Sequence, residues 1–259
     1  MQTAVECTSS GVVLRGMLHA PDHITGKSPA VILFHGFTGS KTGAQFVFVE
    51  LCRRLEKKGI ASVRFDFSGS GESDGDFMGT TLTSQLSDAS NILDYVRSLD
   101  FVDKEKVMIL GMSLGGVIAS LLAADRKDEI HALCLWCPAA IVVQDLKEGK
   151  LQNIDISHLD NWEYIDVRGL KLGKDFVNDA LCWDIYATAS YYNKNVLLIH
   201  GDQDDLVPIS VSEKYLETYG QKAELKVVPG AGHTYESVGW RNQLLDHTLD
   251  FFNRNLTRR

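Results

Sequence analysis

Gly-Met-Ser-Leu-Gly-Gly, at residues 111–116, carries the clearest structural signal in the chain, because of what stands on either side of it. The apolar run of residues 107–110 is typical of a buried strand, and the apolar segment of residues 117–124 is typical of a helix. A G-x-S-x-G motif on a strand-to-helix turn is the setting of a nucleophile elbow. We therefore expect the hydroxyl of Ser113 to be exposed at the carboxyl end of the strand, on a turn that requires glycines.

Strand-like runs alternate with helix-like patterns along most of the chain, which favours the elbow over a plain tight turn packed by small residues. The alternation predicts one α/β domain over residues 1–259, with a mostly parallel central sheet and helices on both faces. After a hairpin-like segment to about residue 18, we expect strands at residues 30–34, 61–65, 107–110, 132–136, 196–199 and 225–228, and helices at residues 45–58, 82–99, 117–124, 211–219 and 240–253.

The pattern breaks over residues 141–195, which contain two tryptophans, several tyrosines and no clean strand. One interpretation is a long irregular connection. Loops of that length usually carry a function, however, so we interpret residues 141–195 as an inserted cap or lid.

Composition narrows the function further. The 259 residues carry a net charge of −8 and are 44% hydrophobic, which suits one soluble domain with a sizeable core. The negative charge argues against nucleic-acid and anionic-membrane partners. Residues 1–7 lack the basic start and apolar region of a signal peptide, and no apolar stretch could span a membrane, so we expect a cytoplasmic location.

Five cysteines, an odd number, do not suggest a disulfide framework. Cys134 and Cys137 have C-x-x-C spacing but lie in a run typical of a buried strand, where alternation would point the two thiols to opposite faces. No second pair or nearby histidine completes a zinc site. We expect reduced, buried thiols and no metal.

A serine nucleophile needs a histidine base oriented by a carboxylate, and after a nucleophile elbow the chain order is serine, acid, histidine. Of the downstream histidines, His233 lies in a flexible turn just after the last predicted strand, which predicts it as the base. The other histidines fit this role less well. His131 is expected near a strand entrance and His200 before the acid loop, whereas His247 falls within a predicted helix and His158 in the cap.

The acid is expected just after the strand at residues 196–199, where three aspartates stand within four positions. The pattern G-x-x-D-x-x-V-P selects Asp204. We interpret Asp202 as a solvated turn residue and Asp205 as a charge at a helix N-terminus.

The oxyanion of an acyl-transfer intermediate needs two N–H donors. Leu114, directly after the serine, supplies one, and Phe37, in the loop after the strand at residues 30–34, supplies the other. We expect His35 to brace this loop and Gly36 to allow a close backbone approach. The glycine-rich residues 69–75 fail the dinucleotide-binding pattern and read as a structural turn, so no cofactor is expected.

Over nearly its whole length the chain resembles the α/β-hydrolase superfamily, and more closely the bacterial feruloyl (cinnamoyl) esterases. The matching stretches are residues 34–39, 62–67, 71–75 and 138–140 and the blocks around Asp204 and His233. The resemblance implies hydrolysis of esters of hydroxycinnamic acids, with the aromatic acid held under the cap. It also implies that Asp145 contacts the ring hydroxyl, and that a second contact, a cap tyrosine in the family, falls at Phe176, which lacks the hydroxyl.

Two elbow positions also depart from that family, because Met112 and Leu114 stand where His and Gln are usual. The leading hypothesis is a serine carboxylesterase acting on a small ester, such as a hydroxycinnamate ester. Alternatives are a monoacylglycerol lipase, a small serine peptidase or a binding protein on a hydrolase fold. The sequence leaves the acyl and alcohol specificity open. It also leaves open the oligomeric state, for which a homodimer is one possibility.

Overall fold

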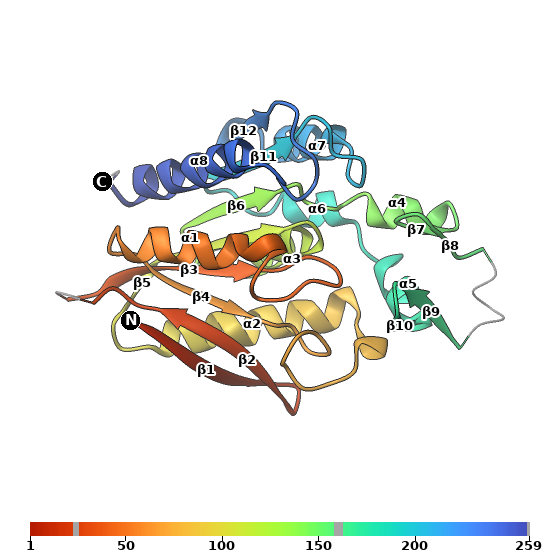
Figure 1. Ribbon diagram of the computed structural model, residues 1–259, viewed down its shortest axis with the longest axis horizontal. Helices are drawn as coiled ribbons and strands as arrows, with labels where there is room; N and C mark the ends of the chain where they lie inside the picture. Colours follow the sequence, from red (N-terminus) through yellow and green to blue (C-terminus); the bar gives the residue numbers. More distant parts are fainter. Residues whose placement is uncertain (23–25, 158–162, 258–259) are drawn as a thin grey trace.

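The computed structural model describes residues 1–22, 26–157 and 163–257, and its centre is an eight-stranded sheet (Figure 1). The strands of this sheet are β1 (Gln2–Ser9), β2 (Val12–His19), β3 (Ser28–Phe34), β4 (Ala61–Phe65), β5 (Val102–Met112), β6 (Ala132–Trp136), β11 (Val196–Gly201) and β12 (Ala223–Val228). Their order is β1-β2-β4-β3-β5-β6-β11-β12. All strands from β4 to β12 in that order are parallel, whereas β2 is antiparallel to β1 and β4, which confirms the predicted hairpin and the mostly parallel sheet.

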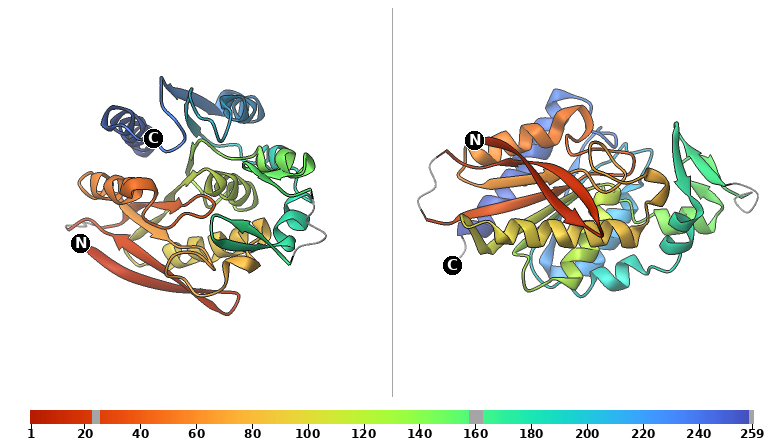
Figure 2. Two further views of the ribbon diagram at one scale, coloured as in Figure 1. Left: turned by 45° about the vertical axis from the view of Figure 1, so that its right-hand side comes forward. Right: turned by 90° about the horizontal axis from the view of Figure 1, so that it is seen from below.

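Helices cover both faces of the sheet (Figure 2). On one face, α1 (Val47–Glu56) and α8 (Val238–Thr257) form an apolar core with β3, β5, β6 and β11. On the other face pack α2 (Leu82–Ser98), α3 (Leu114–Asp125) and α7 (Ile209–Tyr219). The inner strands are continuous apolar runs because both of their sides are buried.

The expected helices are present, with shifts at some ends. Helix α1 begins at Val47 and not at residue 45, because Gln45 and Phe46 have φ values of 44° and 65°, which a right-handed helix cannot continue. Helix α2 begins where predicted, since the hydroxyl of Thr81 caps it by accepting a hydrogen bond from the N–H of Ser84. None of the helices among the described residues is long and apolar enough to cross a membrane.

The expectation that residues 141–195 hold no strand is wrong. They form helices and two small antiparallel sheets: α4 (Val142–Lys147), β7 (Lys150–Leu151), β8 (Ile154–Asp155), β9 (Tyr164–Val167), β10 (Leu170–Gly173), α5 (Lys174–Ala180) and α6 (Ile185–Ala189). Strands of two to four residues are too short to give a recognisable period of two. In Figure 1, α4, α5 and β7 to β10 gather beyond the carboxyl ends of the parallel strands, far from both termini.

Candidate active site

Ser113 lies on the turn between β5 and α3, as predicted. Its backbone has φ 56° and ψ −123°, a conformation that few residues other than glycine adopt. A side chain at Gly111 would place its Cβ 2.1 Å from the carbonyl oxygen of Gly115, and one at Gly115 would come 2.3 Å from that of Phe34. Because both distances are far inside van der Waals contact, the turn requires glycine at these two positions.

Asp204 and His233 follow two neighbouring parallel strands, β11 and β12, whose ends bring the side chains together. Nδ1 of His233 lies 2.7 Å from Oδ2 of Asp204. The other carboxylate oxygen accepts hydrogen bonds from the N–H groups of Leu206 at 2.9 Å and Val207 at 2.8 Å, which fix its orientation. His233 and Ser113 line the same pocket, and Asp204 is hydrogen-bonded to His233, so the structure gathers all three predicted residues at one end of the sheet.

The pKa values of Asp204 and His233 are shifted in opposite directions, so that each favours the charged form of the other. Burial would raise the pKa of the Asp204 carboxyl, but hydrogen bonds from His200 and His233 hold this pKa well below its usual range. Burial lowers the pKa of His233, whereas the neighbouring Cys137 and the Asp204 carboxylate raise it, and the raising effects dominate. The site therefore stabilises the imidazolium that forms when a histidine base takes a proton.

His200 is a member of the site that the sequence reasoning missed. Its Nε2 lies 2.8 Å from the carbonyl oxygen of Val207 and 3.2 Å from Oδ2 of Asp204. A carbonyl can only accept, so Nε2 carries the proton, and Nδ1 accepts from the hydroxyl of Ser212 at 2.7 Å. His200 thus donates toward the buried carboxylate. Its position four residues before Asp204, at the end of a buried strand, is the signal that could have identified it.

The other candidates in the acid loop and among the histidines have structural partners. Asp202 accepts a hydrogen bond from the N–H of Gly230 at 2.7 Å. The interpretation of Asp205 as a helix charge is wrong, because the first turn of α7 contains no acidic residue. The Nε2 atom of His131 pairs with the carbonyl of Asn255, and His247 lies within α8; His158 is outside the described residues.

The loop after β3 lies directly against the serine. A Cβ built on Gly36 would come 2.9 Å from Cβ of Ser113, so Gly36 permits the close approach that was expected. Leu114 is the first residue of α3, where N–H groups have no partner within the helix. His35 accepts from the N–H of Phe67 at 3.1 Å and donates to the carbonyl of Gly36 at 2.8 Å, which confirms that it braces this loop.

A buried ion pair anchors the far end of the same loop. Asp66, whose side chain is fully buried, accepts hydrogen bonds from the N–H of Lys41 at 2.6 Å, from Nζ of Lys41 at 2.5 Å and from the N–H of Glu72 at 2.9 Å. Gly71 has φ 54°, and a Cβ there would come 2.3 Å from the Asp66 carboxylate. Residues 69–75 are therefore the structural turn that was expected, and they also close over a carboxylate that holds the loop carrying Phe37.

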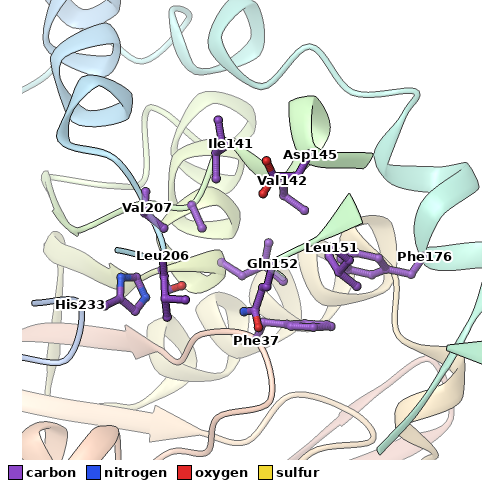
Figure 3. A pocket seen from close by; sticks show the side chains of 13 residues that line it. Phe37, Ile141, Val142, Asp145, Leu151, Gln152, Phe176, Leu206, Val207 and His233 are labelled. Carbon is purple, nitrogen blue, oxygen red and sulfur yellow. The ribbon is translucent and has the colours of Figure 1, made fainter. Parts of the chain in front are cut away.

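The pocket beside Ser113 is mostly apolar (Figure 3). Asp145 and Phe176, both predicted to contact substrate, line it, and the ring of Phe37 packs 5.3 Å from that of Phe176. Burial raises the pKa of the Asp145 carboxyl, although Lys150, 3.4 Å away, lowers it in part. In this conformation the cavity volume is about 40 Å³, room for about three water molecules.

Strand alternation predicted that the two C-x-x-C thiols point to opposite faces of the sheet, and this prediction is wrong. Cys137 follows the end of β6 with φ 36°, so its side chain joins that of Cys134 in the core under α1 and α8. Both thiols are free and buried, as expected. A ligand atom from each of Cys137, Asp204 and His233 lies within 4.8 Å of the others, but the Asp204–His233 hydrogen bond already uses two of them, which favours proton transfer over metal binding.

Known proteins share this architecture. Est1E from Butyrivibrio proteoclasticus, in a structure with ferulic acid bound, is 29% identical with a TM-score of 0.91, covering 98% of this chain and 100% of that one. Alpha/beta hydrolase domain-containing protein 10 from mouse is 21% identical with a TM-score of 0.75, over 97% of this chain and 99% of that one, a likeness of fold alone.

Sequence comparison adds a curated relative and a family. The human mitochondrial palmitoyl-protein thioesterase ABHD10 is 27% identical over 213 residues, which cover 75% of this chain but only 64% of that protein. The model of the prolyl oligopeptidase family matches residues 50–259. The match covers most of the chain, including Ser113, Asp204 and His233. Together with the structural neighbours it confirms the expected superfamily: the chain belongs to the prolyl oligopeptidase family and has the α/β-hydrolase fold.

Proposed function

We propose that the protein is a serine carboxylesterase in which Ser113 is the nucleophile, His233 the general base and Asp204 the residue that orients the base. The observation that carries the proposal is the 2.7 Å hydrogen bond between Asp204 and His233, next to a pocket shared with the strained Ser113. Similarity to Est1E and to a thioesterase supports hydrolysis at an ester-like carbonyl.

In this mechanism the Ser113 oxygen attacks the ester carbonyl while Nε2 of His233 takes the hydroxyl proton. The carbonyl oxygen becomes an oxyanion, which accepts hydrogen bonds from the N–H groups of Phe37 and Leu114. His233 then protonates the departing alcohol, and the C–O bond of the ester breaks. Water, deprotonated by His233, attacks the acyl-serine, and the proton returns to the serine oxygen as the acid leaves.

For the acyl group we propose a hydroxycinnamate, held under an inserted cap formed by residues 141–195. Support comes from the apolar pocket with a single lining carboxylate, Asp145, among the described residues, and from the bound ferulic acid in the similar Est1E structure. Asp145 would accept a hydrogen bond from the ring hydroxyl, and Phe176 would pack on the ring without donating. Because the cavity volume is only about 40 Å³, side chains of the pocket must move to admit a phenyl ring.

The test compares kcat/KM for methyl ferulate, p-nitrophenyl butyrate, a monoacylglycerol and a dipeptide anilide. The proposal expects the ferulate ester to be the best of these, with a single adduct at Ser113 after treatment with a serine-directed phosphonate. A preference for the glycerol ester or the anilide would replace the esterase assignment by a lipase or a peptidase. Absence of both turnover and phosphonate labelling would leave a binding protein.

A further inference from the structure

A second pocket meets the first at the reacting centre. Ser113, His233 and Phe37 line both pockets, but the second extends away from Asp145 and Phe176, between the loop after β3 and the β9–β10 hairpin. Its cavity volume is about 180 Å³, against about 40 Å³ for the first. Its lining is also more polar and includes Thr38 and Ser40.

Arg168 reaches this second pocket from the tip of the hairpin. Arg168 and Gly169 form its two-residue loop, with φ values of 55° and 90°, as a type I′ turn requires. The first of these positions is normally Asn, Asp or Gly, so an arginine there is strained. The N–H of Gly169 donates to Asp166 at 2.8 Å, which fixes the turn and so the origin of the arginine side chain.

The charge of Arg168 is not neutralised by any carboxylate in the part of the chain that the structure describes. The ion pairs of arginines among the described residues do not include one of Arg168, and no described carboxylate lines the second pocket. Glu236, two residues after the lining residue Thr234, does not line the pocket, and it accepts a hydrogen bond from the Thr234 hydroxyl. In a chain with a net charge of −8, a cation that has no carboxylate partner among the described residues and lines a pocket together with Ser113 is a specific local feature.

We propose that the second pocket receives the alcohol part of the ester and that Arg168 selects alcohols bearing an anionic group, a carboxylate or a phosphate. This inference rests on the proposed function, in which the first pocket holds the acyl group. The departing alcohol then has to lie on the other side of Ser113, where His233 delivers its proton. A guanidinium binds both kinds of anion through paired N–H donors.

The experiment holds the acyl group constant and changes only the alcohol. Feruloyl glycolate carries a carboxylate, and feruloyl glycolamide is its neutral isostere; the feruloyl ester of 2-hydroxyethyl phosphate, compared with that of ethylene glycol, tests the phosphate. At low ionic strength we expect kcat/KM to be roughly tenfold higher for at least one anionic ester than for its neutral partner. The pair of esters that shows the preference identifies the anion as a carboxylate or a phosphate. Salt at 0.5 M should reduce this preference.

Arg168→Gln should abolish the preference and leave kcat/KM for methyl ferulate within about twofold. Lys171→Gln is the matched control, since Lys171 is a cation of the same hairpin that lies over the ring of Tyr164 and does not line the pocket. Equal losses in the two variants, or no preference for either anion in the unmodified enzyme, would overturn the proposal.

Failure of the acyl assignment can be distinguished from failure of this inference. If butyrate esters prove better substrates than ferulate esters, the same alcohol series is made with butyrate. The ratio of anionic to neutral ester then still measures the role of Arg168. A ratio that depends on Arg168 with either acyl group supports the inference, and a ratio near one with both rejects it.

Discussion

His200 and His233 share one oxygen of Asp204: Nε2 of His200 lies 3.2 Å from Oδ2, and Nδ1 of His233 lies 2.7 Å from the same atom. With the two backbone N–H groups on Oδ1, the buried carboxylate has four donors around it. This environment keeps Asp204 ionised and aims it at His233.

His200 does not line the pocket beside Ser113, so its removal should act through Asp204 and not through substrate contacts. We expect His200→Ala to lower the free energy of unfolding by about 1–3 kcal/mol, because buried polar groups lose partners. It should also lower kcat, as the carboxylate is held less firmly. Urea unfolding and steady-state kinetics measure both, and Ser212→Ala, which keeps the N–H donor of His200, should have the smaller effect on kcat.

The proposed triad should behave as one unit. Ser113→Ala and His233→Ala should each lower kcat by roughly 10⁴-fold or more, and the double variant should lose little beyond either. Asp204→Asn should cost somewhat less, yet far more than Asp202→Asn or Asp205→Asn. Circular dichroism checks that folding is intact. Near-normal turnover in His233→Ala, or a crippling effect of Asp202→Asn, would contradict the assignment.

The pH dependence of activity should reflect the raised pKa of His233. Only the neutral imidazole can act as a base, so kcat/KM should rise with pH as His233 loses its proton, with a midpoint above the usual value of about 6.5. Asp204→Asn removes the negative charge that opposes the burial effect, so the residual activity should have a midpoint at lower pH. An unchanged midpoint would show that Asp204 does not set the pKa of the base.

The free energy of unfolding should depend on Asp204 at acidic pH, whereas the activity depends on His233 at higher pH. The folded-state pKa of Asp204 lies below the unfolded value of about 3.9, so its contribution is fully present above that value and is lost as the pH falls through the folded-state pKa. Asp204→Asn should accordingly lose less stability between pH 6 and pH 3 than the unmodified protein. Unfolding midpoints in urea at several pH values provide the measurement.

The ion pair beneath the loop that carries Phe37 should matter for both stability and rate. Lys41→Met leaves the buried Asp66 without its cation, which we expect to cost about 3–5 kcal/mol of unfolding free energy. Any folded protein should show a lower kcat, because the loop is held less firmly. Glu72→Gln is the control: Glu72 also pairs with Lys41, but its side chain is 75% exposed, so the loss should be small.

The acyl pocket offers a test of substrate reading. Asp145→Ala should lower kcat/KM for 4-hydroxylated cinnamates by roughly tenfold or more, because a buried hydrogen bond to the ring is lost. Hydrolysis of p-nitrophenyl acetate, which is too small to reach Asp145, should barely change. Phe176→Tyr should improve caffeate or ferulate esters selectively. An equal loss of kcat/KM on every substrate in Asp145→Ala would show that the residue supports the structure and does not contact the ring.

Local pattern was enough to predict the sheet, the turn at Ser113 and the neighbourhood of Asp204 and His233. Periodicity records which side of a strand or helix is buried, and glycines mark turns that exclude side chains, so both are written in neighbouring residues. The strands β7 to β10 escaped this reasoning because they are too short to show a period.

The contacts between distant parts of the chain were decided only by folding. Lys41 and Asp66, His200 and Ser212, and the joint pocket of Arg168 and Ser113 arise when strand ends and hairpin tips meet in space. Cys137 shows the same limit at short range, since one residue with φ 36° reverses the side expected from alternation. The residues of the candidate site could therefore be named from the sequence, whereas their supports and the pockets depend on tertiary packing, which no local periodicity encodes.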